Sequence, residues 1–184
     1  MTTDQQRITV QRTIDAPAQD LFRVLSNPER HADLDGSGFV RSDERSDRIT
    51  ANGQVFRMNM TGPHMGGDYQ TDNHVTGYDE NKLLAWKTAP AGTEPPGWEW
   101  MWELKPTSPS STDVALTYDW SRVTDKDLLA KVSFPLVTQD QLEASLAGVP
   151  STDYFTPVHG FDSIMSADIA HDAPATAPFT ATNR

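Results

Sequence analysis

The segment Trp98-Glu99-Trp100-Met101-Trp102-Glu103-Leu104 places a large apolar side chain at every second position. Successive side chains of a β-strand point to opposite faces, so this pattern predicts a strand with one aromatic face and one mostly charged face. The next such segment repeats the alternation with Val114, Leu116, Tyr118 and Trp120. Two neighbouring strands with four Trp and one Tyr on one face require other parts of the chain to cover that face.

Composition limits the classes of function. The chain of 184 residues has no cysteine, which excludes disulfides, thiolate catalysis and Cys-ligated zinc. A net charge of −11 disfavours nucleic acid and anionic membranes as partners. The five histidines form no H-x-x-x-H pair, so neither a metal site nor a cofactor is expected. No apolar run approaches the ~20 residues of a membrane span, and residues 1–7 lack signal-peptide features, so a cytoplasmic location is expected.

The order of predicted elements is one strand, two short helices, about six strands and a final helix. The first strand covers Arg7 to Ile14, and Asp15-Ala16-Pro17 predicts a helix start with aspartate as the N-cap. A second short helix is predicted from Glu29 to Leu34. Strand-like runs joined by short turns then continue to about residue 122 without helices, which predicts an antiparallel sheet.

Helical patterns return after the sheet. One helix is predicted from Asp125 to Val132, and Thr138 with Gln141 forms a capping box for another, which Gly148 and Pro150 keep to roughly ten residues. The expected domain covers residues 1–149. An extension of residues 150–184 is expected to be partly disordered, and helical spacing over 161–170 leaves open a short docking helix.

Several stretches together resemble the START-like, or SRPBCC, helix-grip superfamily, in its polyketide cyclase/dehydrase branch. They are Ile14-Asp15-Ala16-Pro17, Gly53 to Met60, Asp72 to Tyr78, Leu84-Ala85-Trp86, Leu116 to Ser121, Phe134-Pro135 and Leu142 to Leu146. The resemblance covers roughly residues 7–149. It implies an α+β helix-grip fold, a curved antiparallel sheet of about seven strands around a C-terminal helix. The final helix here is shorter than is usual in that superfamily.

The resemblance implies a cavity for a small hydrophobic or aromatic molecule between the sheet and the final helix. Alternation along the strands and the stripe of the final helix then predict the ligand-contacting residues: Phe56, Met58, Met60, Asn73, Trp86, Trp100, Trp102, Tyr118, Trp120, Leu142 and Leu146. Two alternatives remain open at this stage. The same cavity could serve a cyclase or dehydratase, or the protein could be a co-chaperone-like interaction module with Phe161 to Ile169 as its docking helix. The sequence leaves the oligomeric state open.

Candidates for acid/base chemistry are few. Glu99 and Glu103 lie ~13 Å apart along one strand and on the face opposite to the tryptophans. Alternation also places Asp72 and His74 on the outer face. His31 and His64 are expected at the rim of the cavity, so the candidate catalytic residues are Tyr118, His64 and Asn73. No inward-facing carboxylate or histidine is expected, which favours binding over turnover.

Overall fold

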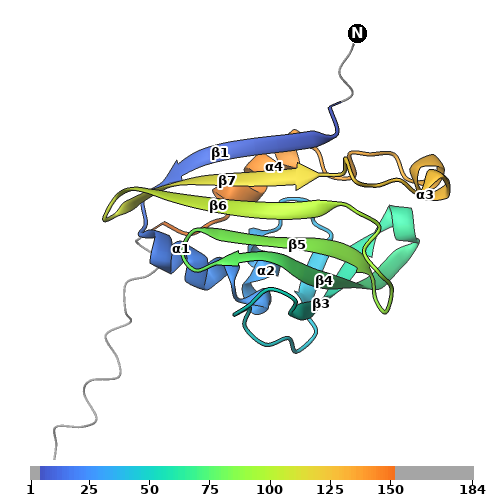
Figure 1. Ribbon diagram of the computed structural model, residues 1–184, viewed down its shortest axis with the longest axis horizontal. Coiled ribbons are helices and arrows are strands. Elements are labelled where there is room, and N and C mark those ends of the chain that lie inside the picture. Colours follow the sequence, from blue (N-terminus) through green and yellow to red (C-terminus); the bar gives the residue numbers. More distant parts are fainter. Residues whose placement is uncertain (1–4, 152–184) are drawn as a thin grey trace, which may run out of the picture.

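A single seven-stranded antiparallel sheet dominates the structure, a computed structural model that describes residues 5–151 (Figure 1). The strand order is β1-β7-β6-β5-β4-β3-β2, so the first strand pairs with the last. The strands are β1 Arg7–Ile14, β2 Val40–Asp43, β3 Val55–Gly62, β4 Gly67–Asp79, β5 Leu83–Pro90, β6 Glu99–Ser108 and β7 Ser111–Asp119. The predicted α+β helix-grip architecture is confirmed.

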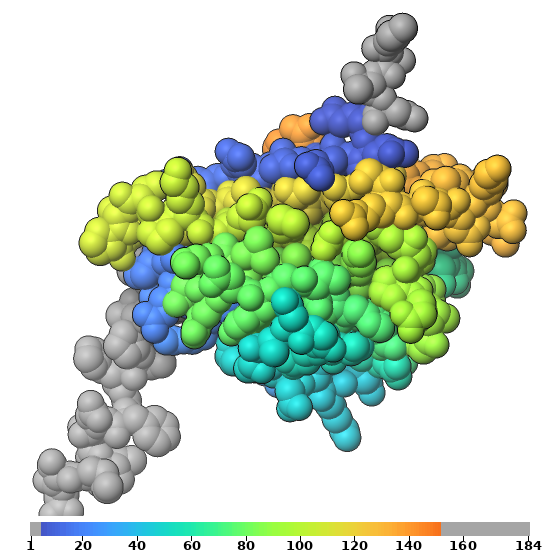
Figure 2. Space-filling model, viewed as in Figure 1, coloured from blue at the N-terminus to red at the C-terminus, as the bar shows by residue number. Residues whose placement is uncertain are grey.

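The register of β6 and β7 explains the tryptophan pattern. Trp100 lies opposite Tyr118 and Trp102 lies opposite Leu116, so the apolar positions of both strands coincide on one face. Since a shift by one residue would turn every one of these side chains to the other face, burial of that face fixes the register. The other face is the outer surface of the sheet, which Figure 2 shows as a continuous surface from β1 to β5.

After β1 come α1 Ala18–Leu25, the 3-10 helix η1 Pro28–Arg30 and α2 His31–Leu34; later elements are the 3-10 helix η2 Pro63–Met65, α3 Lys126–Lys131 and α4 Gln139–Ala147. In the view of Figure 1, α2 and α4 lie behind the sheet and cover its inner face. The predicted aspartate cap of the first helix is wrong, because the chain is still extended at Pro17, which takes the N-cap position. The capping box of Thr138 and Gln141 is present at the start of α4.

A close approach joins α4 to the connection between α2 and β2. The backbone N–H of Gly36 donates to Oγ of Ser145 at 2.9 Å. A Cβ at position 36 would collide with the α4 backbone at Gln141 and Ser145, so only glycine permits this contact. The α2–β2 connection and α4 therefore form one continuous cover over the sheet.

The final helix is short, as its flanking residues predicted: α4 has nine residues and Gly148 is its C-cap. The segment between β7 and α4 adds cover at one end of the sheet, where α3 is seen at the right of Figure 1. Phe134 of this segment stacks on Trp120, with ring centroids 6.3 Å apart. Within residues 5–151, no helix has the length and apolar character required to cross a membrane.

Candidate ligand-binding site

A cavity of about 230 Å³ lies between the inner face of the sheet and its helical cover. The sheet contributes one wall through side chains of β3 to β7. The cover contributes His31 and Leu34 of α2, Leu142 and Ser145 of α4, and apolar residues of the segment 128–137. The wall is mostly apolar and aromatic, with a few polar side chains, which is the composition of small-molecule sites.

Four of the five tryptophans line this cavity. Trp98, Trp100 and Trp102 follow one another along β6, and Trp86 lies directly opposite Trp100 on β5. The ring of Trp100 is stacked on Tyr118 with centroids 4.2 Å apart. Aromatic rings offer large flat contact areas with little conformational freedom to lose, so this wall suits a flat apolar molecule.

Most of the side chains predicted for ligand contact lie on the cavity wall: Met58, Met60, Asn73, Trp86, Trp100, Trp102, Tyr118 and Leu142. Phe56, Trp120 and Leu146 are buried in the core beside it instead. His31 and Trp86 cover Phe56, Phe134 and Tyr118 enclose Trp120, and Leu146 lies one turn beyond Leu142, where α4 packs on β1. Alternation along a strand predicts the face of the sheet to which a side chain points. The packing of the cover decides whether that side chain lines the cavity.

Tyr118 is fully buried, and its hydroxyl forms no hydrogen bond with the described residues. Burial raises the pKa of Tyr118 far above its usual value. The nearby backbone N–H of Leu136 opposes this shift in pKa without reaching hydrogen-bonding geometry. The hydroxyl therefore keeps its proton at physiological pH, which makes Tyr118 a hydrogen-bond donor and a poor general acid.

Among the histidines of residues 5–151, His31 alone lies inside the cover, whereas the sequence predicted a position at the rim. It is buried, lines the cavity and stacks on Trp86 with ring centroids 5.2 Å apart. Nε2 donates to the carbonyl oxygen of Leu25 at 2.7 Å, so in the neutral ring Nδ1 is an acceptor. Burial lowers the pKa of His31, which favours this neutral form. The i, i+3 spacing of His31 and Leu34 was a sequence signal for a shared inward face.

His64, the second catalytic candidate, lies at an exposed position of η2 on the edge of the cavity. Its Nε2 is 3.2 Å from the hydroxyl of Tyr69, and its ring packs against Phe39. Burial, with the nearby charge of Asp35 as a smaller cause, raises the pKa of Tyr69. Asp35 also lines the cavity, but its carboxylate accepts bonds from Ser37 and from the N–H of Val40, which hold the turn before β2.

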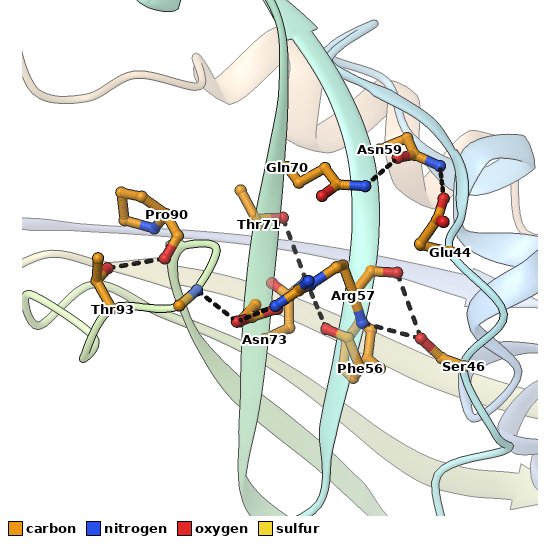
Figure 3. Close-up of polar contacts among 12 residues, drawn as sticks. Glu44, Ser46, Phe56, Arg57, Asn59, Gln70, Thr71, Asn73, Pro90 and Thr93 are labelled. Atoms are coloured by element: carbon orange, nitrogen blue, oxygen red, sulfur yellow. Dashed lines mark hydrogen bonds and ion pairs between the residues drawn. The ribbon is translucent and has the colours of Figure 1, made fainter.

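Asn73, the third catalytic candidate, lies on the cavity wall with Thr71 and Thr88. Figure 3 shows Asn73 beside Thr71 and Phe56, to which its amide nitrogen donates. Its oxygen accepts from the hydroxyl of Thr88 at 2.6 Å. Asn73 therefore joins β3, β4 and β5 through side-chain bonds within the cavity wall.

The acidic residues Asp72, Glu99 and Glu103 of the strands do not line the cavity. Asp72 points away from the cavity and accepts two bonds from Arg57, at 2.7 and 2.9 Å, and one from the N–H of Gly92. The bond from Arg57 is the main reason why the pKa of Asp72 is lowered. Glu99 bonds to Thr76, and Glu103 is exposed. No three His, Asp or Glu side chains among residues 5–151 gather closely enough to hold a metal ion.

Residues 15–147 match the sequence family described as Activator of Hsp90 ATPase homolog 1-like protein, or AHSA1. This match covers well over half of the chain. The chain belongs to the AHSA1 family. The predicted membership of the START-like helix-grip superfamily is thereby confirmed.

This AHSA1-family chain is similar in sequence to curated proteins and in fold to solved structures. The uncharacterized protein Rv0088 of Mycobacterium tuberculosis is 32% identical over 114 residues, which are 62% of this chain and 47% of that protein. The chain thus spans about half the length of the curated relatives it matches. Protein Ms6760 of Mycobacterium smegmatis has a TM-score of 0.54 at 15% identity, covering 83% of this chain and 91% of that one. A protein of Arthrobacter aurescens has a TM-score of 0.58 at 12% identity, covering 80% and 85%.

Proposed function

We propose that this AHSA1-family protein binds a small hydrophobic or aromatic molecule in the cavity between the sheet and α4. The observation that carries the proposal is the row of Trp86, Trp100 and Tyr118 on adjacent strands, all three of which line the cavity. A folded chain normally fills its interior to near-crystalline density. A cavity of about 230 Å³ lined by aromatic rings therefore loses dispersion contacts that a ligand would restore.

The volume limits the size of the ligand. Sites for drug-sized molecules occupy roughly 300–1,000 Å³, so the cavity suits a smaller ligand of one to three rings. Met58 and Met60 form part of the wall, and flexible thioether side chains adapt to ligands of different shape. At ~0.3 kcal/mol per heavy atom, a three-ring ligand of about 14 heavy atoms binds with a dissociation constant of ~1 mM, and the higher efficiency per atom of small ligands lowers this value.

Ionisable groups at the cavity favour binding over catalysis. The carboxylate of Asp35 accepts hydrogen bonds from Ser37 and Val40 in the turn before β2. The raised pKa of Tyr118 keeps its hydroxyl protonated near neutral pH, so it does not transfer its proton. His31 is neutral and one nitrogen is committed to the backbone. Asp35, Tyr118 and His31 can therefore orient a ligand through hydrogen bonds, but none of these three groups is suited to proton transfer near neutral pH.

A fluorescence titration tests the proposal. N-phenyl-1-naphthylamine is a neutral probe that brightens in apolar surroundings, and it absorbs where indoles emit. We expect saturable brightening with one site per chain, together with quenching of tryptophan emission by energy transfer. Addition of a non-fluorescent aromatic competitor should reverse both signals. The proposal is overturned if the probe shows no saturable signal and a battery of neutral aromatic compounds gives no heat of binding by calorimetry.

The co-chaperone-like alternative depended on Phe161 to Ile169, which lie outside the described residues. The expected domain boundary at residue 149 likewise remains a prediction. Every residue that lines the cavity lies between Leu25 and Ser145, so the binding proposal does not depend on the extension.

A further inference from the structure

Three polar side chains interrupt the apolar wall of the cavity at one place. Thr71 and Asn73 lie on β4 and Thr88 on β5, with Asn73 directly opposite Thr88 in the register. All three line the cavity and are 5%, 4% and 9% exposed. Burying polar groups in an apolar wall costs free energy unless their hydrogen bonds are satisfied. We refer to these three residues as the polar cluster.

The hydrogen bonds within the polar cluster leave one donor and one acceptor free to bind a ligand. Thr88 donates its only hydroxyl hydrogen to Oδ1 of Asn73 at 2.6 Å, so its oxygen retains free lone pairs. Nδ2 of Asn73 contacts the carbonyl oxygen of Phe56 and Oγ1 of Thr71, both at 3.4 Å, which is long for a hydrogen bond. Thr71 only accepts, and its own hydrogen has no acceptor among residues 5–151. The cluster thus offers a donor at Thr71 and an acceptor at Thr88.

The complement of a neighbouring donor and acceptor is a hydroxyl group, which accepts one hydrogen bond and donates another. Asn73 bridges Thr71 and Thr88, so a single small group placed over Asn73 lies within reach of both. An ether or ketone oxygen would satisfy Thr71 alone. A hydrocarbon would satisfy neither.

The charges in the cavity wall restrict the chemical class of the ligand further. No lysine or arginine of residues 5–151 lines the cavity, so a carboxylate or phosphate would be buried there without a counter-charge. The Asp35 carboxylate of the wall belongs to the turn before β2, where Ser37 and Val40 bond to it. Since Thr71, Asn73 and Thr88 carry no charge, the group that binds them is neutral. Trp86 precedes Thr88 by two residues on the same face of β5, so a flat ring beside the indole brings a ring substituent to the cluster.

We propose that the polar cluster binds the hydroxyl group of a neutral, flat aromatic ligand, a phenol of one to three rings. This proposal rests on the proposed function and names the class of molecule that the cavity selects. A phenol with a pKa near ~10 is uncharged at neutral pH, as the wall requires.

The decisive experiment compares three ligands of nearly equal shape on the full chain by calorimetry: 2-naphthol, 2-methoxynaphthalene and 2-methylnaphthalene. The hydroxyl compound donates and accepts, the methoxy compound only accepts and the methyl compound does neither. A net hydrogen bond changes affinity about two- to tenfold. We expect 2-naphthol to bind about fivefold or more tightly than 2-methylnaphthalene, with 2-methoxynaphthalene between them. Anionic 2-naphthoate should bind more weakly than all three.

Variants of Thr71 and Thr88 test whether the polar cluster causes the preference for 2-naphthol. Thr71→Val and Thr88→Val keep the β-branched shape but remove the hydroxyl, and each should reduce the preference for 2-naphthol to less than twofold. Thr71→Ser and Thr88→Ser should retain it. Thr117→Val is the matched control, because Thr117 is equally buried on β7 but bonds to Thr9 and does not line the cavity. This variant should keep the full preference.

The outcomes separate the two proposals. Equal affinity of the wild-type protein for the three neutral compounds overturns the hydroxyl site while leaving a ligand-binding cavity in place. A preference that survives both valine variants also overturns it. Absence of binding by all three compounds overturns the hydroxyl site and the proposed function together. The three-ligand comparison on the wild-type chain decides the matter even if a valine variant does not fold.

Discussion

The rings of Trp100 and Tyr118 lie nearly parallel, 9° apart, with centroids separated by 4.2 Å. The two residues are direct partners in the β6–β7 register, so the stack is a property of the sheet. It holds the Tyr118 ring in the cavity wall, while the buried hydroxyl forms no hydrogen bond with any of residues 5–151. The stack buries apolar ring surface, but it also buries the polar hydroxyl of Tyr118. The effect of this hydroxyl on stability can be tested by mutation.

Tyr118→Phe is expected to leave stability unchanged or to raise it. The substitution removes a buried hydroxyl that has no hydrogen-bond partner among residues 5–151, which relieves a desolvation cost of about 1 kcal/mol and keeps the ring stack. Urea unfolding followed by circular dichroism measures the change. Tyr69→Phe is the control, because it removes a hydroxyl that contacts His64. A loss of more than about 1 kcal/mol in the Tyr118 variant would show that the hydroxyl has a stabilising partner.

Stability is expected to fall steeply above pH ~10. The pKa of Tyr118 is raised in the folded protein, so the unfolded chain loses that proton at a lower pH than the folded chain. The unfolded state then binds fewer protons, and the free energy of unfolding decreases as pH rises. Urea midpoints measured between pH 8 and pH 11 should show this decrease, and Tyr118→Phe should reduce its slope. Parallel slopes in the two proteins would contradict the assignment.

Asp72→Asn is expected to destabilise the protein at neutral pH but not at acidic pH. The lowered pKa of Asp72 means that its ionised form is favoured by folding, chiefly through Arg57. That contribution is present above the unfolded pKa of ~3.9 and is lost as pH falls through the folded value. We expect a melting temperature ~2–4 °C below wild type at pH 7, with the difference shrinking below pH ~4. Asp79→Asn, whose aspartate forms only an exposed pair with Lys82, should have little effect at either pH.

Met60→Trp is expected to fill the cavity and weaken probe binding at least about tenfold. Met60 is half-buried on the cavity wall, so a larger side chain at this position occupies space that a ligand needs. Val55→Trp is the matched control, since Val55 lies on the same strand but is 47% exposed and does not line the cavity. Titration of both variants with N-phenyl-1-naphthylamine measures the effect. Equal loss of binding in the two variants would mean that the probe binds elsewhere.

Removal of residues 152–184 is expected to leave probe affinity within about twofold of the full chain. All residues that form the cavity precede Ser151, and α4 is closed by its own C-cap at Gly148. The measurement is the same fluorescence titration on the shortened and full chains. A large loss of affinity would assign part of the site to the removed segment.

The sequence alone determined the sheet and the side chains of its inner face. Alternation at Trp98, Trp100 and Trp102 has a period of two, and burial on one side fixes which set faces inward, so Met58, Asn73 and Tyr118 could be placed without coordinates. The capping box at Thr138 and the stop at Gly148 are local signals, which is why the length of α4 was also predictable.

Only the tertiary structure decided which inward residues reach free space. The cover is assembled from segments distant in sequence, such as Gly36 against Ser145 and Phe134 over Trp120. This packing encloses Phe56, Trp120 and Leu146, and it brings His31 and the segment 128–137 to the cavity. No periodicity within one segment encodes the distance between two layers. The shape of the cavity and the unused hydrogen-bonding capacity of Thr71, Thr88 and Tyr118 therefore follow from packing between elements.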